Sequence, residues 1–140
     1  MSEAVREVPK KERPKFTNIH VTQLSNYRLP IAGFVSILHR ISGFLIFLAL
    51  PVILYMLQKS LLSEDTFKHF AGIASHPLAK LVILVLAWSY FQHFAAGVRH
   101  LFMDVHLAIE KDSSRQSATA VIAVSLFLTF VTALKLFGVF

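Results

Sequence analysis

The sequence contains no cysteine and has little charge. Only 16% of its 140 residues are charged, and Asp and Glu together number 8. Without cysteine the chain can form no disulfide, no thiolate-ligated zinc or iron–sulfur site and no thiol nucleophile. A metal or cofactor held by this chain must therefore be bound through histidine, carboxylate or backbone groups.

Apolar residues dominate instead. They make up 55% of the chain, Phe alone accounts for 13 positions, and the windows 41–58, 81–98 and 117–134 carry no charge. As an α-helix, each window would span ~27 Å, close to the ~30 Å hydrocarbon core of a bilayer. The sequence predicts an all-α integral membrane protein with three transmembrane helices in an up-down bundle.

Proline and polar residues indicate where these helices begin and end. Pro30 and Pro77 are each expected in a first turn, where the missing N–H costs nothing, and the polar run 112–114 is expected to break the chain before the third helix. We predict helices over about 30–58, 77–109 and 116–138, with a loop at 59–75, in one domain (30–140) after a tail (1–29). Within 118–134 the third helix offers hydroxyls such as Ser125 but no titratable group, so we expect a structural role.

Positive charge is distributed unevenly around the predicted helices. The tail and the second loop hold nine basic residues, against four near the opposite ends: Arg6, Lys10, Lys11, Arg13, Lys15, Arg28, Arg99, Lys111 and Arg115, against Lys59, Lys68, Lys80 and Lys135. The positive-inside rule predicts a cytoplasmic N-terminus and a C-terminus on the opposite side. We expect the tail to contact anionic lipid rather than nucleic acid, since no aromatic residues interleave with its charges. No small-residue cleavage site follows the first apolar window, so a removable signal peptide is not expected.

Two groups of polar side chains recur at helical spacing near the predicted cytoplasmic boundary. The first helix carries Ser36, His39, Arg40 and Gly43 on one face, and the second carries His93, Gly97, His100 and Asp104 on one face. An imidazole within a segment of lipid length is costly to desolvate, so it indicates a functional site. An arginine at the membrane edge can instead be an anchor that extends its charge to water.

His93 lies six residues, or ~9 Å along the helix axis, deeper than Arg99. This depth suits a porphyrin: an imidazole nitrogen can ligate the iron, while Arg40, Arg99 or a protonated His39 can pair with the propionates. Gly97 leaves room on the same face for a flat macrocycle. The alternative is that His93 is a buried histidine hydrogen-bonded to another helix.

Three separate features resemble the cytochrome b membrane-anchor subunit of succinate dehydrogenase, respiratory complex II. They are the segment SILHRISG at 36–43, His93, and the segment GVRHLFMD at 97–104. The resemblance covers essentially the whole chain, although Lys15 follows Arg13-Pro14 where the family has an apolar residue. It implies partners, namely a second small anchor subunit, an iron–sulfur subunit and a flavoprotein, with electrons passing from succinate to ubiquinone beside haem b.

Position by position, the resemblance implies His93 as one axial ligand of the haem iron, with the second histidine on the partner anchor. It places His39 and Arg40 at the propionates and Ser36 and Arg40 at the quinone, with Asp104 as a further candidate there. The chain would then lie in a bacterial inner membrane, or in that of a mitochondrion, and would carry no complete active site of its own.

Two other functions remain open. One is the anchor of a fumarate reductase, with a different haem or none. The other is a small proton-conducting protein in which His93, His100 and Asp104 form a relay. The second is disfavoured because one face of one helix supplies nearly all the titratable groups and the third helix supplies none.

Overall fold

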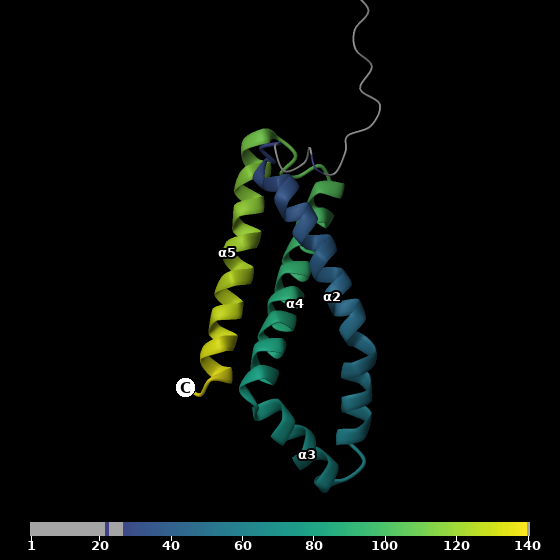
Figure 1. The fold of residues 1–140 in the computed structure, drawn as a ribbon. Helices are drawn as coiled ribbons and strands as arrows, with labels where there is room; N and C mark the ends of the chain where they lie inside the picture. The colour runs from purple at the N-terminus through teal and green to yellow at the C-terminus, as the bar shows by residue number, and fades with distance from the viewer. Residues whose placement is uncertain (1–21, 23–26, 140) are drawn as a thin grey trace, which may run out of the picture.

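The protein is a bundle of α-helices. The structure, a computed structural model, describes residue 22 and residues 27–139. Its helices are α2 (Ile31–Ser60), α3 (Glu64–Ser75), α4 (Pro77–Asp104) and α5 (Lys111–Leu136), and no strand occurs in this part of the chain. Figure 1 shows α2, α4 and α5 as three long rods, with the shorter α3 linking α2 to α4 at the lower end. The predicted all-α fold is confirmed.

Three helices are long and apolar enough to cross a membrane. They contain 30, 28 and 26 residues, in α2, α4 and α5 respectively. At ~1.5 Å per residue each exceeds the ~30 Å hydrocarbon core. Large apolar side chains face outward, and Phe47, for example, is 71% exposed. Such a surface suits acyl chains rather than water, so the chain is a multi-pass membrane protein.

The helix boundaries differ from the predicted ones around the second connection. Helix α4 ends at Asp104 rather than near residue 109, and His106 and Ala108 then adopt φ angles of 62° and 57°. Helix α5 begins at Lys111, so the polar run 112–114 forms its first turn instead of a break before it. Asp112 favours this start because a carboxylate interacts well with the positive end of a helix dipole.

The segment 59–75, predicted as a loop, contains helix α3. Ser63 caps this helix by accepting a hydrogen bond from the Thr66 backbone N–H at 3.2 Å. The Thr66 hydroxyl donates to the Lys59 carbonyl oxygen at 2.7 Å and so connects the start of α3 to the end of α2. At its other end α3 is separated from α4 by His76 alone.

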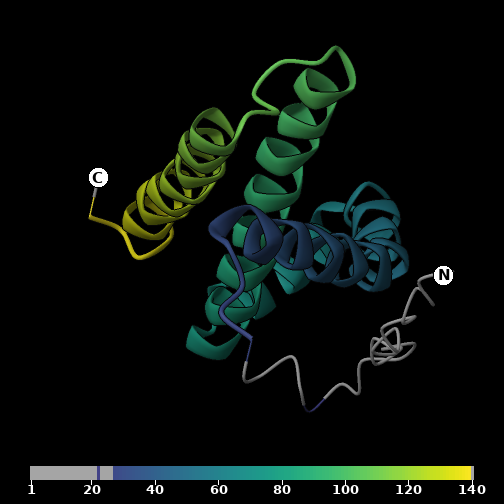
Figure 2. The same ribbon diagram turned by 90° about the horizontal axis from the view of Figure 1, so that it is seen from above.

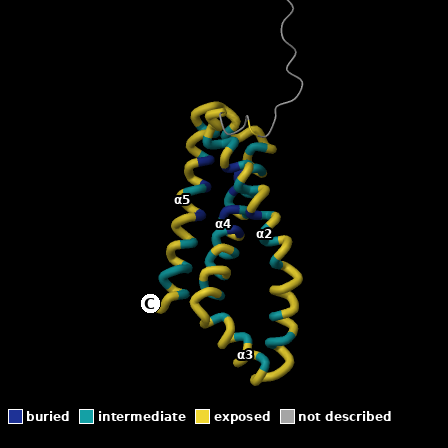
Figure 3. The backbone as a smooth tube through the Cα atoms, in the orientation of Figure 1, coloured by how far each residue is buried: buried dark blue, intermediate teal, exposed yellow. Residues whose placement is uncertain are grey.

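Tight packing is confined to one half of the bundle. In Figure 3 the buried residues cluster towards the end at which α2 begins. The small apolar core consists of Val35, Ala96, Ala118 and Val121, which come from all three long helices. Towards the other end α2 and α4 diverge, and they border, with α3, an apolar cavity of about 1230 Å³ lined by residues such as Met56, Ile73 and Leu86.

Buried polar side chains join α4 to α5. The Ser125 hydroxyl donates to Gln92 Oε1 at 2.7 Å, and Gln92 itself is only 1% exposed. Seven residues along α4, Arg99 bonds Ser114 and Ser117 of α5. Gln92 Nε2 has no hydrogen-bond partner among the described residues. Because water is scarce at this depth, the Ser125 bond is the main compensation for burying the Gln92 amide.

We predict that Ser125→Ala destabilises the assembled protein by about 1–2 kcal/mol, because it leaves the buried Gln92 amide with no partner. The double variant Gln92→Leu, Ser125→Ala should recover most of this loss, since it removes both polar groups. The measurement is unfolding in mixed detergent followed by circular dichroism. Thr132→Ala is the matched control, because the Thr132 hydroxyl bonds only the Leu128 carbonyl of its own helix. Equal losses for Ser125→Ala and Thr132→Ala would contradict the interhelical role.

Candidate functional site

Three histidine rings from two helices meet where α2 crosses α4. The rings of His39 and His93 stack, with centroids 4.2 Å apart and an interplanar angle of 6°. His100 lies beside them, with its ring centroid 5.0 Å from that of His39. We call these three residues the histidine cluster. His39 of the first polar face therefore lies against His93 and His100 of the second, a contact that their common membrane depth allows but does not determine.

His93 is oriented by the backbone of the neighbouring helix. Its Nδ1 lies 3.1 Å from the carbonyl oxygen of His39. A carbonyl oxygen can only accept, so Nδ1 must carry the proton in this hydrogen bond. The lone pair of the neutral ring is then on Nε2, and no described residue hydrogen-bonds that atom. Metal-ligating histidines commonly have this arrangement, in which the second nitrogen donates to a carbonyl or carboxylate group.

Gly43 allows this close approach of α4 to α2. A Cβ atom at position 43 would lie 2.7 Å from Cε1 and 2.9 Å from Nδ1 of His93, so any larger residue must displace the ring. Gly97 is different, because a Cβ there would make an ordinary 3.8 Å contact with Nε2 of His39. Gly43 is thus the tighter of the two glycines, a distinction that helical spacing alone could not make.

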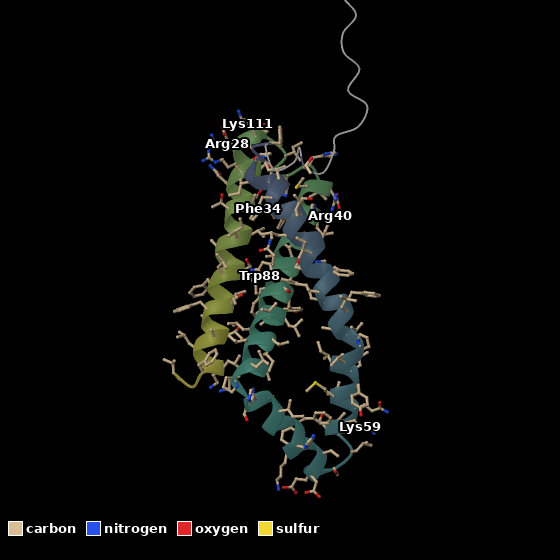
Figure 4. The ribbon with its side chains drawn as sticks, viewed as in Figure 1. Arg28, Phe34, Arg40, Lys59, Trp88 and Lys111 are labelled. Atoms are coloured by element: carbon tan, nitrogen blue, oxygen red, sulfur yellow. The ribbon has the colours of Figure 1, made fainter. Side chains whose placement is uncertain are left out.

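The remaining candidates on these faces have no side-chain partner among the described residues. Arg40 and Asp104 are exposed and Ser36 is half-buried. Within the described residues, none of the three side chains forms a hydrogen bond or ion pair. Figure 4 shows Arg40 extending away from α2, toward the end of the bundle that also carries Arg28 and Lys111. These polar groups are available to bind a molecule from outside the chain.

The structure does not bring Arg99 to the histidine cluster. Its side chain is 5% exposed and faces α5, with Nε 3.0 Å from the Ser117 hydroxyl and Nη2 2.9 Å from the Ser114 hydroxyl. The depth of Arg99 in the membrane suits a partner of a haem propionate. Its side chain, however, points toward α5 and not toward the histidine cluster. Gln92 lies seven residues earlier on the same face of α4, and its bond to Ser125 shows that this face meets α5.

The cluster is not a complete protein-only metal site. Among the residues that the structure describes, no three His, Asp or Glu side chains are arranged to hold a metal ion. Its one well-oriented donor, Nε2 of His93, suits a group that needs a single ligand from this chain. The donor set therefore fits a haem whose other axial ligand is supplied elsewhere.

The fold and the site define a helical membrane subunit that presents one oriented histidine between two transmembrane helices. Residues 10–132 match the family model described as succinate dehydrogenase/fumarate reductase transmembrane subunit, and the chain belongs to that family.

Similar proteins include the succinate dehydrogenase cytochrome b556 subunits of three bacteria. The Coxiella burnetii protein is 34% identical over 79% of this chain and 88% of its own. The Paracoccus denitrificans protein is 30% identical over 81% of this chain and 88% of its own. The Rickettsia felis protein is 28% identical over 77% of this chain and 84% of its own. The predicted resemblance is confirmed.

We predict that Gly43→Ala displaces the His93 ring, because the added methyl carbon would lie only 2.7 Å from Cε1 of that ring. The strain should destabilise the protein by roughly 1–3 kcal/mol. The measurement is nuclear magnetic resonance of ¹⁵N-labelled histidine side chains, together with thermal unfolding. Gly97→Ala is the matched control and should leave the His93 signals and the stability nearly unchanged. Identical spectra for wild type and Gly43→Ala would show that the ring does not lie against α2.

Proposed function

We propose that this chain is the membrane anchor of a succinate:ubiquinone oxidoreductase, that it supplies one axial ligand to haem b, and that it forms part of the ubiquinone-reduction site. The observation that carries the proposal is the His93 hydrogen bond to the His39 carbonyl, which leaves Nε2 between two membrane helices with no partner among the described residues. The family match and the printed names of the bacterial relatives support it.

The haem would be held by His93, with the second axial histidine on a partner anchor subunit. When bound, haem b supplies a one-electron carrier within the membrane. The His93 ring is held in its ligating tautomer by the His39 carbonyl, and Gly43 gives it space beside α2. His39 and Arg40 are the candidates for binding the propionates. Arg99, which the sequence also suggested, is left out because its guanidinium is bonded to α5.

Ser36 and Arg40 are the proposed quinone-binding groups. They lie one turn apart near the start of α2, and no described residue competes for their donors. A hydroxyl and a guanidinium can both donate to a quinone carbonyl oxygen, and the charged donor makes the stronger bond. Asp104, the last residue of α4, is exposed at the same end of the bundle and is proposed to relay protons from water.

Succinate oxidation would take place on partner subunits. The chain has no cysteine with which to ligate an iron–sulfur cluster. We therefore assign the flavin and the clusters to a flavoprotein and an iron–sulfur subunit, which would bind on the side of the membrane where α2 begins. The bacterial relatives support a location in the cytoplasmic membrane.

Fumarate reduction is the second candidate function, since the family description includes fumarate reductases. A difference spectrum and a redox titration of the purified complex would distinguish the two. A haem that succinate reduces, with ubiquinone as the preferred acceptor, supports the first function. A complex without haem that reacts with a low-potential quinone favours the second.

We predict that His93→Leu abolishes the low-spin haem spectrum of the assembled complex, or alters it by ligand substitution. The measurement is a reduced-minus-oxidised absorption spectrum with a redox titration. His69→Leu, in exposed α3, is the matched control and should retain the wild-type spectrum. An unchanged spectrum and midpoint potential in His93→Leu would remove His93 from the haem.

We predict that Ser36→Ala and Arg40→Leu impair ubiquinone reduction while the complex still oxidises succinate with a soluble dye. Losing a donor to a buried carbonyl should cost roughly 1–3 kcal/mol of quinone binding, and more for the charged group. Ser36→Ala should therefore be the milder variant. Ser60→Ala and Lys59→Leu, at the other end of α2, are matched controls. Normal rates and Michaelis constants for ubiquinone in both test variants would place the quinone site elsewhere.

A further inference from the structure

A second, smaller cavity lies between α4 and α5, on the side of α4 opposite His93. Its volume is about 420 Å³, within the ~300–1,000 Å³ range of small-ligand pockets. Its walls are almost entirely apolar and include Phe94, Val98, Phe102, Val124 and Leu128. Arg99 and Ser117 also line it, so one end of an apolar cleft carries a buried cation.

The charge of Arg99 is not neutralised by the described chain. Its hydrogen bonds go to the hydroxyl of Ser117 and to the hydroxyl and carbonyl oxygens of Ser114, all of which are uncharged. Within the described residues it forms no ion pair, and its Nη1 atom has no hydrogen-bond partner. An arginine that is 5% exposed in a membrane helix is costly unless an anion accompanies it.

Further cations lie at the same end of the bundle. Lys111 and Arg115 are exposed on the first two turns of α5, on either side of Ser114, to which Arg99 is bonded. Figure 2, seen from above, shows the start of α5 joined to the end of α4 by a short connection at this end. Glu110 and Asp112 also lie here, but neither pairs with Arg99. This end of the cleft therefore carries an excess of positive charge, as is typical of a protein surface that lies among anionic lipid headgroups.

We propose that the α4–α5 cleft binds an anionic phospholipid of the leaflet on this side, with one acyl chain in the cleft and the phosphate on Arg99. The guanidinium supplies a charged donor fork suited to phosphate oxygens. Phe94, Phe102 and Val124, which line the cleft, are themselves exposed on the outer surface of the bundle, so a chain can enter laterally from the bilayer. The site is separate from the histidine cluster and uses a different face of α4.

The test uses the assembled complex, reconstituted in phosphatidylcholine–phosphatidylglycerol vesicles at roughly four to one and then re-extracted in mild detergent. Native mass spectrometry counts the phosphatidylglycerol that remains bound. Arg99→Gln removes the charge, Arg99→Lys keeps it, and Ala120→Phe fills the cleft while leaving Arg99 in place. Lys68→Gln, an exposed cation of α3, and Ala123→Phe, which does not line the cleft, are the matched controls.

We expect Arg99→Gln to weaken phosphatidylglycerol retention at least roughly tenfold, as loss of a charged hydrogen-bond donor implies. Ala120→Phe should reduce it as well, Arg99→Lys should retain part of it, and the two controls should match wild type. Equal retention in wild type, Arg99→Gln and Ala120→Phe would overturn the proposal. A second pair of results would also overturn it: the wild-type complex retains no phosphatidylglycerol, and the Arg99→Gln complex loses a subunit. Arg99 would then pair with a carboxylate of a partner subunit instead of a phosphate. If the Arg99→Gln complex does not assemble, the comparison of phosphatidylglycerol retention between Ala120→Phe and Ala123→Phe decides: equal retention would overturn the proposal.

Discussion

The contact between His93 and the His39 carbonyl joins α2 to α4 at the candidate site. It is a single hydrogen bond of 3.1 Å, but it requires the helices to approach closely, and Gly43 is the residue that permits this approach. The same bond sets the tautomer of His93 and so the position of its free nitrogen. One backbone carbonyl therefore takes part both in the contact between these two helices and in the chemistry of the candidate site.

Helix α4 has two polar faces, one toward α2 and one toward α5, and their side chains differ in how they are hydrogen-bonded. The face toward α2 carries His93 and His100, whose rings lie close together but make few hydrogen bonds within the described chain. The face toward α5 carries Gln92 and Arg99, whose bonds to serines hold the two helices together. In a bilayer, packing gains little from the hydrophobic effect, so polar contacts and small residues must specify the partners. The attachment of α4 to α5 therefore does not use His93 or His100, whose rings lie on the other face.

The sequence predicts the three long helices because bilayer thickness imposes a length that apolar windows reveal directly. It does not predict α3 from hydropathy, since that helix has only 12 residues, although Ser63 followed by Glu64 and Asp65 is a typical helix start. The sequence predicts the depth of Arg99 but not the helix that its side chain faces, which becomes known only from the structural bonds of Gln92 and Arg99 to serines of α5. The contact of Gly43 with His93 depends on the register between two helices, which helical spacing within one segment cannot determine.

Helix α3 has a mechanical consequence for the opposite end of the bundle. Its start is bound to α2 through the hydrogen bond from Thr66 to the Lys59 carbonyl, and its end is separated from α4 by His76 alone. The length of α3 therefore fixes the connection between two membrane helices. Each residue of a helix turns the chain by ~100°. A residue inserted in or deleted from α3 would therefore rotate α4 about its own axis. The direction in which His93 points is thus tied to the length of a helix at the other surface of the membrane.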